Sequence, residues 1–167
     1  VAHIHYVLFG GSMFGIFAGI YFWYPKMFGR MMNEKLGQIH FWLSFIFFNG
    51  TFFAMHILGI GGFPRRIANY LNYPSFSHFQ EMNIFITWCA FGLGLSQIPF
   101  IINFVWSIWA GKKTNSDNPW EATTLEWNTP TPPPHGNFAQ APRVYRGPYE
   151  YTAPGAPADF LPQNQPS

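Results

Sequence analysis

The chain has 167 residues and a formal net charge of +2, with 49% hydrophobic, 21% aromatic and only 10% charged residues. Soluble domains carry about 25% charged residues, so this composition excludes an ordinary soluble domain. The small net charge argues against a nucleic-acid partner. The single cysteine, Cys89, excludes a disulfide framework.

Charged residues and prolines divide the chain into two parts. Residues 1–111 contain seven charged residues, whereas residues 112–167 contain nine, together with eleven of the fifteen prolines. The first part is therefore predicted to be a membrane domain. The second is predicted to be an extended, proline-rich tail.

Three apolar stretches in the first part lack Asp, Glu, Lys and Arg, namely residues 1–24, 36–60 and 82–111. A membrane helix needs about 20 such residues, so transmembrane helices are predicted at about 1–27, 36–60 and 82–111. The fold class is then an all-α membrane protein. Because residue 1 already lies in a hydrophobic segment, we expect the chain to be a piece of a longer protein.

Basic residues in the connecting segments predict an orientation. Positive charges accumulate on the cytoplasmic or matrix side of membrane proteins. They occur after the first and third spans, at Lys26, Arg30, Lys35, Lys112 and Lys113. The N-terminus and the second connection, "GGFPRR" with Arg65 and Arg66, are then predicted on the outer side, and the tail on the cytoplasmic or matrix side.

His3 and His5 stand at the start of the first span, where ionisable residues are functional candidates by default. Positions i and i+2 of an α-helix point about 200° apart, so these two side chains cannot easily bind one metal ion together. If both are ligands, they are predicted to serve two centres on opposite flanks of the helix. Haem irons, with propionates toward Arg65 and Arg66, would explain all four residues. Histidines bonded to neighbouring protein groups remain the alternative.

The segments carrying these residues resemble subunit I of the haem-copper cytochrome c oxidases. "VAHIHYVL" is similar to the family segment "VAHFHYVL", and "WYPKMFGRMMNEKLGQIHFWLSFIFFNGTFFAMHILGIGGFPRRIANY" is similar to the next segment of the family. The tail "NPWEATTLEWNTPTPPPHGNF" resembles the family's tail. The resemblance implies the last three helices of a twelve-helix bundle, with the C-terminal tail after them.

The resemblance also implies residue roles. His3 matches the ligand of the high-spin, oxygen-binding haem iron, and His5 matches a ligand of the low-spin haem iron. Arg65 and Arg66 match an arginine pair that contacts haem propionates. Ile4 stands where the family commonly has Phe. Two haems of the A type are expected, with copper B nearby but liganded by residues outside this chain.

The implied function is to hold both haems in a proton-pumping oxidase that reduces oxygen to water with electrons from cytochrome c. Expected partners are the N-terminal portion of subunit I, subunits II and III, cytochrome c and membrane lipid. The membrane would be a bacterial plasma, thylakoid or mitochondrial inner membrane. The alternatives are a haem-copper quinol oxidase, a small haem-binding electron carrier, and a non-catalytic assembly protein.

Overall fold

The computed structural model describes residues 1–67, 69–148, 150, 158 and 160–166, and it divides into two compact units. Unit 1 comprises Val1–Ile20 and Asn33–Trp106, and unit 2 comprises Tyr21–Met32 and Ser107–Ser167. Three helical spans are long and apolar enough to cross a membrane: Ala2–Phe28, Glu34–Ile60 and Pro74–Ala110. The predicted helical fold class with three such spans is confirmed.

The first span is not α-helical throughout. It begins as α1 (Ala2–Ile4), continues as a π-helical segment over His5–Gly10, and becomes α2 (Gly11–Phe28). The α-helical spacing that separates His3 from His5 therefore does not continue past His5. Short π-helical segments occur often at functional sites. This one begins at a predicted ligand.

The second span, α3 (Glu34–Ile60), begins two residues before its predicted start because polar side chains fix its first turn. The Asn33 side chain caps the helix by accepting a hydrogen bond from the Leu36 amide at 3.1 Å. Asn103, which is fully buried, exchanges two hydrogen bonds of 2.8 Å with the Asn33 backbone. These bonds tie the start of α3 to α5.

The third span is interrupted. A 3₁₀ turn at Pro74–Phe79 leads into α4 (Gln80–Leu95), and α5 (Gln97–Ala110) begins after a break at Ser96. Pro99 lies just beyond the break, and proline lacks the amide that would bond the carbonyl four residues earlier. The Ser96 hydroxyl and the Gln97 side-chain amide both donate to the Leu93 carbonyl, at 2.7 and 3.1 Å.

Polar side chains at this break also join the third span to α3. The His40 Nε2 lies 3.2 Å from the Gln97 Oε1, and the Ser44 and Ser96 hydroxyls lie 2.9 Å apart. His40, Ser44 and Ser96 are all buried. Hydrogen bonds of this kind stabilise helix contacts where no water is available. His40 is therefore a buried residue of the helix interface with a hydrogen-bond partner on the third span.

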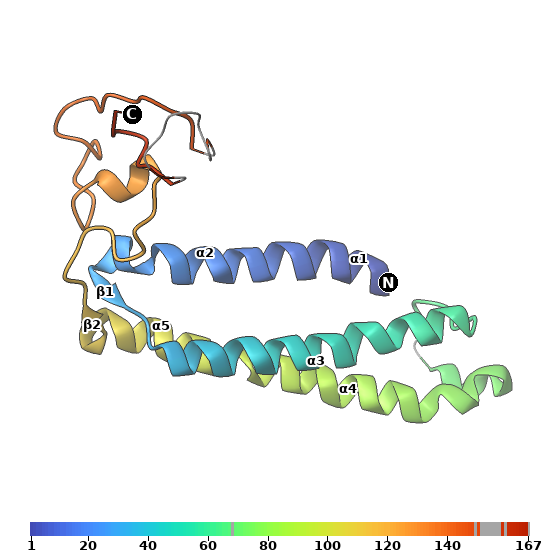
Figure 1. The fold of residues 1–167 in the computed structure, drawn as a ribbon. Coiled ribbons are helices and arrows are strands. Elements are labelled where there is room, and N and C mark those ends of the chain that lie inside the picture. Colours follow the sequence, from blue (N-terminus) through green and yellow to red (C-terminus); the bar gives the residue numbers. More distant parts are fainter. Residues whose placement is uncertain (68, 149, 151–157, 159, 167) are drawn as a thin grey trace. The chain divides into compact units, whose positions relative to one another are not determined.

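Helices α3 and α4 lie side by side, as Figure 1 shows, and small residues allow their close approach. A Cβ atom added at Gly50 would lie 2.6 Å from the Cys89 Sγ, and one at Gly92 would lie 2.5 Å from the Phe47 ring. Toward the α3 C-terminus the contact is filled by a hydrophobic cluster. It consists of Ala54, Leu58, Phe79 and Ile86.

Unit 2 contains the one sheet of the described residues, a ladder of β1 (Arg30–Met31) and β2 (Lys112–Lys113). The strands are antiparallel, and Arg30 is paired with Lys113. The Thr114 amide extends the ladder by donating to the Gly29 carbonyl at 3.0 Å. Gly29 has φ +65°, a conformation that glycine adopts at little cost.

The described part of the tail is held by side-chain bonds around a 3₁₀ turn at Leu125–Asn128. Lys26 is only 5% exposed, and its Nζ donates to the Thr129 carbonyl at 2.6 Å and lies 5.4 Å from the Trp127 ring centroid. Gln163 is also buried and links three tail segments. Its Oε1 accepts from the Leu125 amide at 3.0 Å, and its Nε2 donates to the Arg146 carbonyl at 3.2 Å.

Candidate functional site

The His5 ring is fixed at its edge by the backbone of its own helix. Its Nδ1 lies 2.9 Å from the Val1 carbonyl oxygen. Because a carbonyl only accepts hydrogen bonds, Nδ1 must carry the proton. A neutral His5 therefore keeps the lone pair on Nε2. This is the tautomer in which metal-binding histidines present Nε2 to an ion while Nδ1 donates to a backbone carbonyl.

The His5 ring is also fixed on its face. Its centroid lies 4.5 Å from that of Phe52 on α3, with 15° between the ring planes. His5 is half-buried, whereas His3, two residues earlier on α1, is exposed. The two histidines thus have different surroundings: one is clamped against α3, and the other is presented outward.

Tyr6 anchors the next residue of the π-helical segment to α3. Its hydroxyl donates to the Asn49 Oδ1 at 2.5 Å, and its ring packs edge-on against Phe48 at 4.9 Å. The Tyr6 and His56 ring centroids are 5.5 Å apart. The buried Nδ1 of His56 has no hydrogen-bond partner within the described residues. His56 therefore packs as an aromatic ring in this cluster.

Arg65 and Arg66 lie in the loop after α3, and both are exposed. Gly62 and Arg66 have φ angles of +82° and +66°, which give the loop two sharp changes of direction. Figure 1 shows this loop and the N-terminus at the same end of unit 1. The contact of Tyr6 with His56 agrees with that placement. The two predicted ligands and the two arginines thus share one end of the helices.

His5 can offer a single donor atom, Nε2, to a metal. Within the described residues, no group of three or more His, Cys, Asp or Glu side chains could hold a metal ion together. Haem iron needs only one or two protein ligands, because the macrocycle supplies the others. The Nδ1-protonated His5 has the correct donor atom for such a role.

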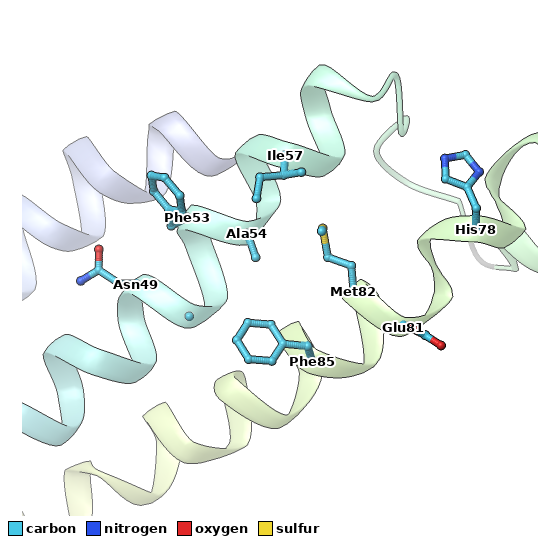
Figure 2. A pocket seen from close by; sticks show the side chains of 9 residues that line it. Asn49, Phe53, Ala54, Ile57, His78, Glu81, Met82 and Phe85 are labelled. Carbon is cyan, nitrogen blue, oxygen red and sulfur yellow. The ribbon is translucent and has the colours of Figure 1, made fainter.

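A hollow of about 810 Å³ lies between α3 and α4. Figure 2 shows Met82 and Phe85 projecting from α4 toward α3, with Ala54 and Ile57 on the opposite side. Its walls are mainly apolar, although Asn49, the acceptor for Tyr6, also lines it. His78 and Glu81 also line the hollow, so three of its nine lining residues are polar.

Sequence reasoning missed Val1, Asn49 and Phe52 as neighbours of the candidate ligands. Val1 contributes a backbone atom, so its side chain carries no signal. Phe48 and Phe52 are four residues apart, which places them on one face of a helix. That spacing indicates a packed face. It does not indicate that a histidine of another helix is the partner.

Comparison with known proteins identifies the class. The family profile described as "Cytochrome C and Quinol oxidase polypeptide I" matches residues 1–93, which is more than half of the chain. The matched region contains His3, His5, Arg65 and Arg66. The chain belongs to this family. Haem and copper cofactors are general properties of the family, and its members are oxidase subunits of membrane complexes.

Among individual relatives, the chain is similar to proteins named cytochrome c oxidase subunit 1. It is 51% identical over 151 residues to that of Thermostichus vulcanus, covering 90% of this chain and 26% of the relative. The protein of Synechocystis is 50% identical, with the same coverage. The alternative cytochrome c oxidase subunit 1 of Bradyrhizobium diazoefficiens is 47% identical and covers 99% of this chain and 28% of the relative. The chain thus spans about a quarter of the length of these relatives.

Proposed function

We propose that this chain is the C-terminal portion of the catalytic subunit of a proton-pumping terminal oxidase. The oxidase reduces oxygen to water with electrons from cytochrome c. The observation that carries the proposal is the His5 imidazole, whose Nδ1 donates to the Val1 carbonyl and whose Nε2 lone pair is available to a metal. The family match and the names of the relatives give the reaction class.

In this proposal His3 is the protein ligand of the high-spin haem iron, and His5 is a ligand of the low-spin haem iron. The haems supply electron transfer and oxygen chemistry when bound. The chain's own residues hold and orient the two irons. Arg65 and Arg66, at the same end of unit 1 as the histidines, would stabilise the negative haem propionates. Copper B would be held by residues outside this chain.

The remaining assignments derive from the family. Residues 1–111 would be the membrane domain, with the N-terminus on the outer side and residues 112–167 on the cytoplasmic or matrix side. The partners would be the N-terminal portion of subunit I, subunits II and III, cytochrome c and lipid. The haems would be of the A type. The membrane would be a bacterial plasma, thylakoid or mitochondrial inner membrane.

The test uses the intact membrane complex that contains this chain, with His3→Ala and His5→Ala variants. Reduced-minus-oxidised and reduced-plus-CO difference spectra are recorded for each purified complex, and the polypeptides of the same sample are identified. We expect two haems, of which only one binds CO. His3→Ala should abolish CO binding, and His5→Ala should abolish the low-spin signal. His135→Ala, which changes an exposed tail histidine, is the matched control and should leave both spectra unchanged.

Other outcomes would replace the proposal. A single haem that does not bind CO would indicate a small electron carrier. Two haems in a complex that oxidises quinol but not reduced cytochrome c would indicate a quinol oxidase. Absence of haem from the intact complex would leave a non-catalytic role. Retention of both spectra in His3→Ala and His5→Ala would remove the two ligand assignments.

A further inference from the structure

The plane of the His5 imidazole is set by a residue on another helix. The His5 and Phe52 ring centroids are 4.5 Å apart, and the planes differ by only 15°. The Nδ1 bond to Val1 fixes one atom at the edge of the imidazole, but it still allows the ring to tilt about that atom. The stacked Phe52 ring removes this freedom because a tilted imidazole would collide with it.

Phe52 is itself held firmly. It is 9% exposed, and its ring lies 5.0 Å from that of Phe48 and 6.1 Å from that of Phe9. Gly10 brings the first span close to this cluster, because a Cβ atom there would lie 3.2 Å from the Phe48 ring. The position of the Phe52 ring is therefore determined by the packing of α3 against the first span.

The residue that stacks on Phe52 lies where the first span changes from α-helical to π-helical geometry. His5 is the first residue of the π-helical segment, and the next residue, Tyr6, is bonded to Asn49 of α3. His3 lies before that segment and is exposed. The stacking contact thus distinguishes His5 from His3. A substitution of Phe52 should therefore alter the orientation of the His5 imidazole and leave that of His3 unchanged.

We propose that Phe52 is a positioning residue that sets the orientation of the His5 imidazole and, through it, the ligand field of the low-spin haem iron. The inference rests on the proposed function in assigning an iron to His5. Groups that contact a metal ligand from outside orient it and tune the metal, and their loss commonly costs about 10- to 100-fold in affinity or activity.

The experiment compares Phe52→Leu, which removes the ring, with Phe52→Tyr, which retains it, in the purified intact complex. Phe53→Leu is the matched control, because Phe53 is the next residue of α3, is 60% exposed and packs against His56 rather than His5. The readouts are the electron paramagnetic resonance spectrum of the oxidised low-spin haem and its midpoint potential. The spectrum with CO monitors the other haem.

For Phe52→Leu we expect a shifted or broadened largest g value and a changed low-spin potential, with an unchanged CO spectrum. Phe52→Tyr and Phe53→Leu should resemble the wild type. Loss of low-spin haem in Phe52→Leu alone would support the same role. Wild-type g values in Phe52→Leu, or equal damage in Phe52→Leu and Phe52→Tyr, would overturn the inference. A wild-type complex without a low-spin haem would instead overturn the proposed function, and a low-spin signal that survives in His5→Ala would remove the ligand assignment on which the inference rests.

Discussion

Arg66 combines a positive charge with an unusual backbone conformation. Its φ of +66° is uncommon for residues other than glycine, asparagine and aspartate. Its side chain is exposed at the end of unit 1 that carries the two histidines. A strained loop residue is retained where the surrounding structure requires its position. Because Arg66 is exposed at that end, its positive charge can act on an anionic group bound near the histidines.

Replacing Arg66 with Gln should lower the midpoint potential of the low-spin haem. Glutamine retains similar length but removes the positive charge that stabilises the reduced, more negative state of the site. For an exposed charge the expected fall is on the order of tens of millivolts. A redox titration of the intact complex measures it. Arg66→Lys retains the charge at the same backbone conformation and serves as the control. An unchanged potential in Arg66→Gln would contradict the propionate assignment.

The residues of the candidate site were predictable to different degrees. His3, His5, Arg65 and Arg66 are polar residues in or between apolar stretches, so composition alone makes them conspicuous. The proton on the His5 Nδ1 was not predictable, because it depends on a backbone oxygen at hydrogen-bonding distance. Phe52 was not predictable either. It is one of twenty phenylalanines, and only the packing of two helices selects it.

At the scale of helices, Gly50 controls how closely α3 approaches α4. Gly50→Ala would place a Cβ atom 2.6 Å from the Cys89 Sγ and 3.3 Å from its Cβ. Overpacking of this kind costs about 1–3 kcal/mol. We expect a lower thermal unfolding midpoint of the detergent-solubilised complex, measured by the loss of helical circular dichroism.

Gly59→Ala is the matched control for Gly50→Ala. Gly59 also lies in α3, and nothing lies within 4 Å of a Cβ atom added there. Both variants replace glycine with alanine in the same helix, so their difference reports mainly the clash. Adding Cys89→Ala to Gly50→Ala should restore part of the midpoint, because it removes the sulfur. A Gly50→Ala midpoint equal to that of Gly59→Ala would show that the helices separate there without cost.

The helices were predictable as spans and less so in their internal geometry. Long uncharged apolar stretches predicted all three, since a membrane requires that composition. The start of α3 at Glu34, two residues before the predicted boundary, depends on Asn33 and on its bonds to Asn103 from a distant part of the chain. The break at Ser96 has a local signal in Pro99. The π-helical segment at His5–Gly10 has none, because no residue in it, such as proline, distinguishes it from the α-helix that follows.

At the scale of the whole molecule, Gln163 connects separate segments of the described part of the tail by hydrogen bonds. Its side chain bonds Leu125 and Arg146, and its backbone amide donates to the Thr123 carbonyl at 2.9 Å. Proline content predicted an extended segment. It did not predict that one buried amide side chain would connect parts of the tail that are far apart in sequence. Those hydrogen bonds depend on the three-dimensional positions of backbone donors and acceptors, which composition does not give.

Gln163→Ala should make the tail easier to cleave at Arg146. The variant loses two side-chain hydrogen bonds, each worth about 0.5–1.5 kcal/mol, so local opening should be roughly tenfold more frequent. Limited proteolysis of the intact complex with trypsin, with the fragments identified by mass spectrometry, measures the rate. Gln165→Ala is the control, because the Gln165 side chain is exposed and its backbone oxygen still accepts from Arg146. Equal cleavage rates would mean that Gln163 does not limit opening.

The surroundings of Lys26 differ between synthesis of the chain and the folded structure. During synthesis it is one of the first positive charges after an apolar span, and such charges influence insertion while the nascent chain is still growing. Its later partner, Thr129, is 103 residues farther along. At about 5–20 residues per second, the ribosome needs about 5–20 s to reach it. The Lys26 ammonium group therefore gains this hydrogen-bond partner only after the tail has been made.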